Sequence, residues 1–411
     1  MGPNPTARDL RRINRRTVLQ AMLTDRTISR LELSQRSGLS TGTVTNVVAE
    51  LLAEGIILEA GFEASEGGRR RAILTLNSQY GYFLGGEIGE TDIAVELFDI
   101  TLRKLKAVRY PLASAQNNPA HVVNYVIEGA TSLLQEAQVG QDKILGLGLG
   151  LPGIVERLGD ELVSAPAWGW EPVPLKTMLR EHFSFPLHID NGAKTMALAE
   201  MRLNPGAPME TMAVLHLGTG VSAGVIYEGK LYRGASNSAG EWGHTIMNLD
   251  GQPCRCGRQG CLEAYVGAPG IMRHLRELDA HHPTLGSDGE IGTIAALLTS
   301  MRSGDPVAVQ VVQDTVQYLG AGVANVINLF NPQRVILGGW LGLQLGEFVL
   351  PAIRHATQRY ALKQPFEVAK MSVSVLGRDG VSIGAAIIAL EDFVESVGGR
   401  TSYPTLAAGF L

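Results

Sequence analysis

The sequence predicts an α/β protein in two unequal parts. The first is an N-terminal module of three helices and a two-stranded hairpin, and the second is a larger body in which one α/β pattern occurs twice. Three observations support this prediction. Apolar residues in the first 78 positions follow helical spacing, the remainder alternates short apolar strands with glycine turns and helices, and all three cysteines fall within eight positions. With 411 residues, 45% hydrophobic and 18% charged, the chain can bury a core in each part.

The N-terminal module begins with three predicted helices. In the first, apolar residues recur at helical spacing and arginines occupy the other face; the two sets are Ile13, Val18, Leu19, Met22 and Leu23, and Arg11, Arg12, Arg15 and Arg16. Ser29 can cap a second helix that ends at Gly38, and Ser40 can cap a third that ends at Gly55. The third helix has one apolar stripe in steps of three and four: Val44, Val47, Val48, Leu51 and Leu52.

The second and third helices, with a glycine in the short turn between them, predict a helix-turn-helix. The outer face of the third helix starts with short hydroxyl and amide side chains that suit phosphate and base-edge hydrogen bonds: Ser40, Thr41, Thr43, Thr45 and Asn46. Two predicted strands follow, at 56–59 and 72–76, and arginines lie at the tip of the hairpin: Arg69, Arg70 and Arg71. The hairpin predicts a wing, and therefore a winged helix that binds duplex DNA. An ordinary three-helix bundle is the alternative.

The charge distribution supports an anionic partner for this module. Residues 1–78 contain eleven arginines, no lysine and eight acidic side chains, whereas the whole chain has a net charge of −5. A basic module attached to an acidic body is typical of nucleic-acid binding. A merely solvated basic helix would show the same charge, so charge alone leaves that alternative open.

The body carries one pattern twice. Each half has strands joined by a glycine turn, then a helix, then a further strand; the segments are 83–99, 119–137 and 144–149, and again 212–227, 306–330 and 335–337. Two such halves predict two lobes with a ligand cleft between them. Each glycine loop taken singly is weak evidence for phosphate binding, because a tight turn alone explains it.

The cysteines form a compact metal-binding pattern. Cys254, Cys256 and Cys261 follow closely after His244. Three thiolates and one imidazole are a closed tetrahedral ligand set for a structural zinc ion, one per chain. The alternative is a group of buried thiols in a glycine-rich loop. Clustered cysteines, no secretory N-terminal segment and no apolar run of membrane-spanning length indicate a reducing cytoplasm.

With both parts considered together, the chain from about residue 8 to 395 resembles the ROK family of sugar kinases and sugar-responsive repressors. The most specific element is Gly-Glu-Trp-Gly-His at 240–244 followed by the cysteine segment 254–263; Leu151-Pro152-Gly153, Gly218-Thr219-Gly220 and Gly338-Gly339 support it. The winged helix is typical of the repressor branch, and the arrangement looks like the xylose-type repressors. The resemblance implies a two-lobed actin-like or hexokinase-like (ribonuclease H-like) ATPase-type fold for the body.

The resemblance also implies a domain division and a sugar site. The winged helix would cover 1–78, the first lobe 79–190 with its completion at about 383–411, and the second lobe 191–382 with the zinc motif and a dimerisation helix. His244 would bind zinc through one ring nitrogen and a sugar hydroxyl through the other. The other implied sugar contacts are Asn191, Glu241 and Glu263. For these three residues, a surface or loop-capping role is the alternative.

The sequence departs from the kinases of the family where their chemistry would lie. Gly192 stands at the position of the catalytic aspartate and has no side chain to accept a proton. Asp190 would point to the opposite face of an extended segment. Glu90 and Asp92 lie in the phosphate loop, where their charge would repel a nucleotide. We therefore expect no kinase activity.

Two further departures concern the identity of the sugar. Ala167 stands where the family has a sugar-facing asparagine, and Lys194 stands where a second asparagine is common. Lys194 would either favour an acidic or phosphorylated sugar or point to solvent.

The leading hypothesis is a cytoplasmic repressor of sugar-utilisation genes. It would bind double-stranded operator DNA as a homodimer, with a tetramer as the alternative, and respond to a sugar effector in the interlobe cleft. The helix Pro306–Asn331 is the candidate dimer contact. One alternative is an ATP-dependent sugar kinase that also binds DNA, and another is a regulator that senses a protein partner.

Overall fold

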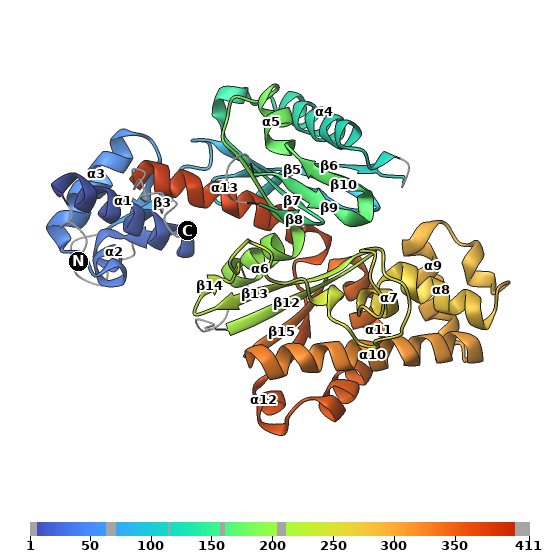
Figure 1. Ribbon diagram of the computed structural model, residues 1–411. Helices are drawn as coiled ribbons and strands as arrows, with labels where there is room; N and C mark the ends of the chain where they lie inside the picture. The colour runs from blue at the N-terminus through green and yellow to red at the C-terminus, as the bar shows by residue number, and fades with distance from the viewer. Residues whose placement is uncertain (1–5, 63–70, 114–115, 157–160, 204–210, 399–411) are drawn as a thin grey trace, which may run out of the picture.

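The computed structural model describes residues 6–62, 71–113, 116–156, 161–203 and 211–398, and it shows an N-terminal module attached to two lobes (Figure 1). The module has three helices, α1 (Ala7–Thr24), α2 (Arg30–Ser37) and α3 (Thr41–Ala53), and a sheet of β1 (Ile28–Ser29), β3 (Ala72–Leu76) and β2 (Ile57–Phe62) in the order β1-β3-β2. Ser29 and Ser40 cap α2 and α3 as predicted, and Gly38 ends α2 in the left-handed region. The predicted helices and hairpin strands are confirmed.

Two residues of α1 differ from the sequence prediction. Arg15, expected on the solvent face, is only 8% exposed, whereas Ile13, expected in the apolar stripe, is 49% exposed. The guanidinium of Arg15 donates hydrogen bonds to Glu50, to Glu54 and to the backbone oxygen of Val397 near the C-terminal end of the described chain. The face of α1 that carries Arg15 is therefore buried by a segment distant in sequence, which helical spacing alone cannot reveal.

Lobe 1 is built on a five-stranded sheet in the order β11-β7-β4-β5-β6. Its strands are β4 (Tyr82–Ile88), β5 (Asp92–Asp99), β6 (Lys104–Pro111), β7 (Ile144–Leu151) and β11 (Leu187–Asn191). Helices α4 (Pro119–Ala137) and α5 (Leu175–Arg180) accompany it, with a small sheet of β8 (Ile154–Val155), β9 (Val163–Ala165) and β10 (Trp170–Val173). Strands β4, β5 and β6 pair antiparallel, and β4, β7 and β11 pair parallel.

Lobe 2 repeats this topology in the order β14-β13-β12-β15-β16, with the same parallel and antiparallel pairs. Its strands are β12 (Thr211–Leu217), β13 (Val221–Tyr227), β14 (Lys230–Leu231), β15 (Arg334–Gly338) and β16 (Lys370–Val373). Its helices are α7 (Glu263–Val266), α8 (Ala268–Leu278), α9 (Gly289–Arg302), α10 (Pro306–Phe330), α11 (Gly339–Tyr360) and α12 (Lys363–Val368). The predicted duplication is therefore present strand by strand.

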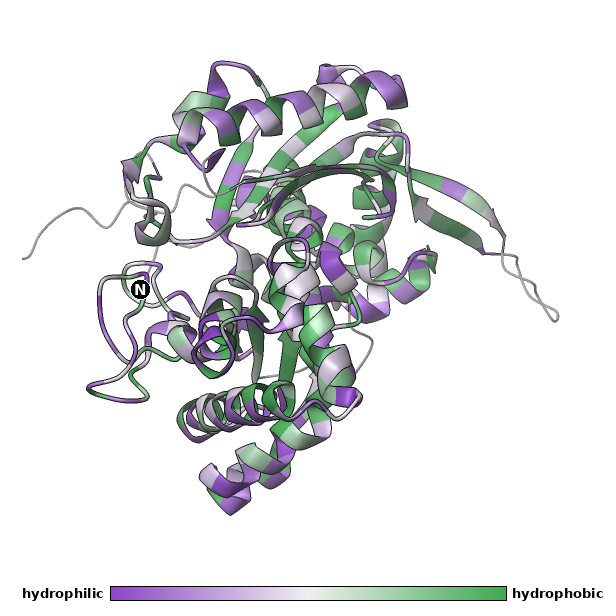
Figure 2. Ribbon diagram, turned by 90° about the vertical axis from the view of Figure 1, so that its right-hand side faces the viewer, coloured by the Kyte–Doolittle hydropathy of each residue, from purple (hydrophilic) through white to green (hydrophobic). Residues whose placement is uncertain are grey.

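The central strands are mostly hydrophobic, and the helices around them carry both hydrophobic and hydrophilic residues (Figure 2). This distribution follows from sheets that are covered by helices and so are buried between layers. Within the described ranges, no helix is both long and apolar enough to cross a membrane.

Two helices lie between the sheets: α6 (Gly192–Leu203) and α13 (Gly380–Gly398), which runs from the junction of the lobes to the N-terminal module (Figure 1). Helix α13 sits directly on glycines of lobe 1. A Cβ atom at Gly148 would lie 1.9 Å from the backbone oxygen of Ala385, and one at Gly85 would lie 2.2 Å from that of Ser382. Such contacts leave no room for a side chain, so α13 is fixed to β4 and β7.

The N-terminal module and lobe 1 share one hydrophobic core through α13. The core joins buried residues of the module, such as Val18, Leu51 and Leu74, to Phe83 and Phe98 of lobe 1. Helix α13 supplies the connecting side chains Ala386, Ala389, Leu390, Phe393 and Val394. The N-terminal module is therefore packed onto lobe 1 and does not form a separate domain with a core of its own.

Candidate functional site

A cavity of about 430 Å³ lies between the two lobes. Lobe 1 contributes Glu87–Asp92 and Ala165–Trp168, lobe 2 contributes residues around Gly218–Ser222 and the cysteine loop, and α13 contributes Gly380 and Val381. The four expected sugar contacts, Asn191, Glu241, His244 and Glu263, all line this cavity. A cleft between lobes is a common place for a small-molecule site.

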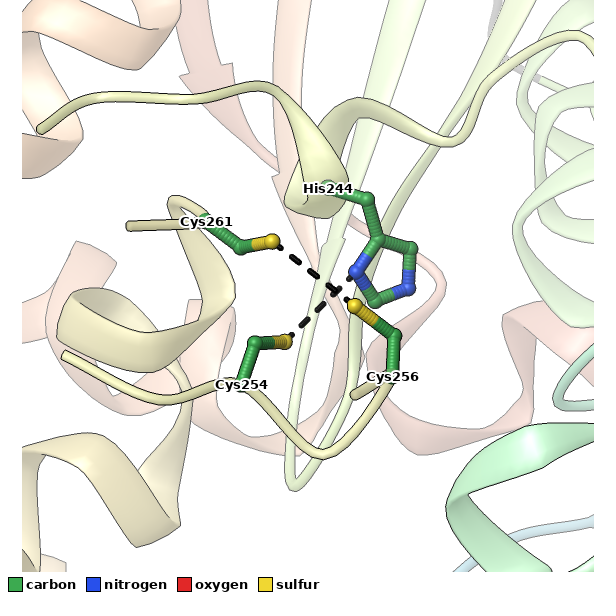
Figure 3. Close-up of side chains that lie close together, drawn as sticks. All are labelled: His244, Cys254, Cys256 and Cys261. Atoms are coloured by element: carbon green, nitrogen blue, oxygen red, sulfur yellow. Dashed lines mark hydrogen bonds between the residues drawn. The ribbon is translucent and has the colours of Figure 1, made fainter. Parts of the chain in front are cut away.

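The predicted metal ligands form a cluster (Figure 3), and two of them, His244 and Cys256, also line the cavity. One donor atom from each of His244, Cys254, Cys256 and Cys261 lies within 4.8 Å of all the others. The Sγ of Cys254 is 3.7 Å from Nδ1 of His244, and the Sγ atoms of Cys256 and Cys261 are 3.8 Å apart. This arrangement brings together three sulfurs and one nitrogen that could hold a metal ion.

The cysteine loop reaches this shape through glycines. Gly257 and Gly260 have φ angles of 84° and 73°, in the left-handed region. A Cβ atom at Gly260 would also lie 1.6 Å from the backbone oxygen of Asn248. Only glycine fits at this position, so the turn that returns the chain toward Cys261 depends on it.

Glu241 and His244 come from one short turn, with the 3₁₀ segment Trp242–His244 immediately after Glu241. Nε2 of His244 lies 4.0 Å from a carboxylate oxygen of Glu241, while Nδ1 faces the sulfurs. Burial raises the pKa of Glu241 above its usual value, and the imidazole opposes this shift. One ring nitrogen thus faces the sulfurs and the other faces the cavity.

Glu263 is buried at the start of α7 and already has protein partners. Its carboxylate accepts a hydrogen bond of 2.9 Å from the backbone N–H of Val221 and lies 3.4 Å from Nη2 of Arg255. Glu263 therefore lines the cavity while it also holds the loop after β12 in place.

Asn191 is also used within its own loop. Its side-chain amide donates to the backbone oxygen of Gly153, and its side-chain oxygen accepts from the backbone N–H of Ala193, both at 2.9 Å. These bonds are those of the loop-capping alternative. Asn191 nevertheless also lines the cavity.

Gly192 lies in the cavity wall, and the carboxylate of its near neighbour Asp190 is directed elsewhere. A Cβ atom at Gly192 would have no neighbour closer than 3.7 Å, so a side chain would fit there and is simply lacking. The carboxylate of Asp190 is buried and accepts hydrogen bonds from Arg233 and Asn237. Asp190 is not among the cavity-lining residues.

Lys194 does not point to solvent, so that alternative is wrong. The side chain is 2% exposed and its ammonium donates to the backbone oxygen of Asn237. It is not part of the cavity lining either. Lys194 lies in the first turn of α6, a helix that packs between α13 and the sheet of lobe 2.

Glu90 and Asp92 differ from the expectation of bare repulsive charges. Both line the cavity, but each is paired with arginine. The carboxylate of Glu90 accepts hydrogen bonds from Arg255, and that of Asp92 accepts from Arg109 at 2.7 Å and Arg378 at 2.6 Å. These arginines could not be predicted from the sequence, because they are 17 to 286 positions away from their partners.

The expected DNA-contacting face lies on the outer side of the module. Ser40, Thr41, Thr45 and Asn46 are exposed and Thr43 is half-buried. The hydroxyl of Ser40 caps α3 by accepting from the backbone N–H of Thr43, and the hydroxyl of Thr45 donates to the backbone oxygen of Thr41. Arg71 is exposed at the start of β3, whereas Arg69 and Arg70 lie outside the described residues.

Fold and site together define a class of protein: a winged helix joined to a two-lobed, sugar-kinase-like body with a cavity between its lobes that both apolar and polar side chains line. A sequence profile described as winged helix-turn-helix DNA-binding matches residues 11–57, and the ROK family profile matches residues 83–392. The chain belongs to the ROK family. The expected fold class is thereby confirmed.

Known relatives include both repressors and kinases. The xylose repressor of Caldicellulosiruptor bescii is 29% identical over 390 residues, which cover 94% of this chain and 97% of that protein. A ROK family transcriptional regulator, described as a homolog of the Escherichia coli MLC protein, superposes with a TM-score of 0.77 at 23% identity, over 95% of this chain and 99% of that one. A ROK glucokinase from Streptomyces griseus, in complex with glucose and AMPPNP, has a TM-score of 0.66 at 28% identity over 75% of this chain and 99% of its own.

Proposed function

We propose that this protein is a sugar-responsive transcriptional repressor that binds operator DNA through its winged helix and a carbohydrate in the interlobe cavity. One observation carries the proposal: a single hydrophobic core connects the winged helix to the lobe that forms one wall of the cavity. The likeness to the xylose repressor also extends over 94% of the chain, the DNA-binding module included, whereas the glucokinase structure covers 75%.

The metal site is best suited to zinc. Tetrahedral coordination with Zn–S bonds of about 2.3 Å would place sulfurs about 3.8 Å apart, and the sulfurs of Cys256 and Cys261 have this separation. His244, Cys254, Cys256 and Cys261 would complete a closed set, so the ion would be structural and would fix the direction of the His244 ring. Metal analysis should find one zinc per chain in the purified protein and little in Cys261→Ser.

The carbohydrate would bind between Glu241, His244, Glu263 and Asn191. Carboxylates accept pairs of hydroxyl hydrogen bonds, and an imidazole nitrogen directed into the cavity can add one more. The apolar parts of the cavity wall, which include the indoles of Trp168 and Trp340, offer surface for the C–H faces of a sugar ring.

DNA binding would use α3 in the major groove and the β2–β3 wing beside it. Thr45 and Asn46, exposed on the first turns of α3, would contact base edges, and the wing arginines would contact phosphates or the minor groove. A homodimer would present two such modules to a palindromic operator. The exposed Leu329 at the end of α10 and the exposed Leu362 after α11 offer an apolar surface for that dimer.

Coupling between the two sites requires that the sugar bind one arrangement of the lobes better than another. Helix α13 begins in the cavity wall at Gly380 and Val381 and ends against α1, where Arg15 donates to the backbone oxygen of Val397. The winged helix would therefore follow lobe 1 when the lobes move around a ligand. A coupling of about 1–3 kcal/mol would change operator affinity by roughly 5- to 150-fold.

An ATP-dependent sugar kinase is the second candidate, favoured by the fold likeness to the glucokinase structure with bound glucose and AMPPNP. The lack of a side chain at Gly192, where such a kinase would need a proton acceptor, argues against this candidate. An ADP-release assay with common hexoses and pentoses separates the two candidates, since turnover that survives Gly192→Ala would establish the kinase.

The test of the proposed function is operator release. Operator fragments selected by the purified protein would be titrated in the presence of D-xylose, D-glucose and other sugars, with the double variant Thr45→Ala/Asn46→Ala as the DNA-binding control. We expect at least one sugar to shift the operator dissociation constant and the control to lose sequence preference. If no sugar bound by calorimetry or shifted the constant, a regulator that senses a protein partner would be the better account.

A further inference from the structure

One ion pair crosses the cavity from lobe to lobe. Glu90 follows β4 in lobe 1, and Arg255 belongs to the cysteine loop of lobe 2. Nη1 of Arg255 lies 2.5 Å from Oε2 of Glu90, and Nη2 lies 3.2 Å from Oε1, so the pair is bidentate. The side chains of Glu90 and Arg255 are 11% and 30% exposed, and water therefore screens them only partly.

The surroundings hold the Glu90 carboxylate in place. The indole N–H of Trp168 donates to the same Oε2 at 3.2 Å. On the other side, a Cβ atom at Gly220 would lie 2.9 Å from Oε1 of Glu90 and 3.6 Å from Nη2 of Arg255. The carboxylate thus rests against the glycine loop 218–220, between one guanidinium and one indole donor.

This set of donors is what an external anion would use. Arginine recognises carboxylate and phosphate by the same bidentate geometry, and backbone that lacks side chains lets an anion approach closely. Arg255 also donates to the backbone oxygen of Thr219 at 3.0 Å and to Glu263 at 3.4 Å. Both terminal nitrogens of Arg255 therefore already have protein acceptors before any ligand arrives.

The other cations around the cavity are also engaged or distant. Arg378 and Arg109 bind the carboxylate of Asp92, and Lys194 is buried against Asn237 outside the cavity. Arg258 lines the cavity but is exposed to solvent, where its charge is screened. His216, in the cavity wall, has its pKa lowered to about 4 by desolvation and carries no charge near neutral pH.

We infer that Glu90 is a specificity-determining residue: it is a built-in counter-ion that fills an anion site on Arg255, so the cavity accepts an uncharged carbohydrate and rejects phosphorylated sugars and nucleotides. This inference rests on the proposed sugar-binding function. A phosphate at Arg255 would have to displace a carboxylate held within the same molecule and would then lie beside it as a like charge. The hydroxyl groups of a neutral sugar carry no such penalty.

The test compares the full-length protein with two Glu90 variants. Glu90→Gly removes the carboxylate and leaves Arg255 and the glycine loop open to an anion. Glu90→Gln keeps an oxygen that can accept from Trp168 but removes the charge, so it serves if the glycine variant folds poorly. Glu171→Gln, on an exposed residue of lobe 1 outside the cavity, is the matched control. Binding of inorganic phosphate, and of glucose against glucose 6-phosphate, would be measured by calorimetry and thermal shift at constant ionic strength.

We expect the wild-type protein and Glu171→Gln to show no specific phosphate binding and to bind glucose 6-phosphate at least about tenfold more weakly than glucose. Both Glu90 variants should gain phosphate binding, and the gain should disappear in Glu90→Gly/Arg255→Met. The inference is overturned if the wild-type protein binds phosphate as well as the variants do, or if neither variant gains it. If no sugar of a wider panel binds the wild-type protein while the variants gain phosphate, the proposed sugar function fails and the role of Glu90 stands.

Discussion

Glu87 shows at the scale of one residue how burial sets the chemistry of the cavity wall. It lies in β4, the central strand of the lobe 1 sheet, and its side chain is only 17% exposed. Burial raises its pKa to about 7, and Asp92 acts in the same direction, while Arg109 at 4.0 Å opposes the shift. Burial prevails because the guanidinium of Arg109 is closer to Asp92, at 2.7 Å, than to Glu87.

This raised pKa predicts a pH dependence of stability. Between the unfolded value of 4.5 and the folded value of about 7, the folded state keeps a proton that the unfolded chain releases. The free energy of unfolding therefore falls as pH rises through this window. Glu87→Gln abolishes this contribution. The free energy of unfolding of the variant, relative to that of the wild type, should therefore increase by roughly 1–3 kcal/mol as the pH rises from about 5 to about 8.

Urea denaturation at both pH values measures this difference, and Glu171→Gln gives the baseline for a solvent-exposed glutamate. Comparison of variant with wild type isolates Glu87 from Glu96, whose pKa burial also raises to about 7. A difference that stayed constant with pH would show that Glu87 is ionised in the folded protein throughout.

Residues whose partners are near in sequence were predictable, and residues with distant partners were not. Ser29 and Ser40 cap helices through bonds to residues three positions ahead, and the cysteine donors lie within one loop. Buried Arg15 donates hydrogen bonds to Glu54 and to the backbone oxygen of Val397. The charge of Glu90 is balanced by Arg255, which is 165 positions away. Periodicity and local spacing carry no information on such pairs.

At the scale of an element, α13 is the structural link between the N-terminal module and the body. Its early residues pack against glycines of β4 and β7, and its later residues enter the core of the module. The family resemblance implied that this segment completes the first lobe, but nothing in the sequence predicted that the same helix also enters the core of the N-terminal module. The spacing of apolar residues predicts that a helix face is buried, but it does not predict which of two neighbouring surfaces buries it.

Phe393 makes this link testable. It is 9% exposed, and its ring lies 6.0 Å from the rings of both Tyr80 and Phe83, centre to centre. Phe393→Ala should destabilise the protein by about 3 kcal/mol or more through the cavity it leaves. Because that cavity lies under the module, hydrogen exchange should accelerate in α1 and α3, and operator affinity should fall.

Phe366→Ala is the matched control, since Phe366 of α12 is similarly buried at 6% exposure but belongs to the core of lobe 2. Phe366→Ala should lower the free energy of unfolding by a similar amount, but hydrogen exchange in α1 should not become faster. Equal exchange in α1 for the two variants would mean that α13 does not hold the module in place.

At the scale of the whole molecule, the protein can be divided into two bodies that share the cavity and that meet where α13 packs against α6. The winged helix, lobe 1 and α13 form the first through their common core, and lobe 2, with the cysteine loop and α10, forms the second. Glu90 and Arg255 connect the bodies across the cavity. A ligand in the cavity touches both, so it can bias their relative position.

This division predicts which distances a ligand changes. Fluorophores would be placed pairwise at three exposed positions: Gln35 in the winged helix, Glu128 in lobe 1 and Glu347 in lobe 2. With the sugar that releases the operator, the distance from 35 to 347 should change while that from 35 to 128 stays constant, because α13 locks the winged helix to lobe 1. Energy transfer in single molecules, with unlabelled chains in excess to exclude signals between subunits, measures both. A constant 35–347 distance with a changing 35–128 distance would place the hinge inside the first body, at the contact between α1 and α13, and α13 could then not be the rigid connection.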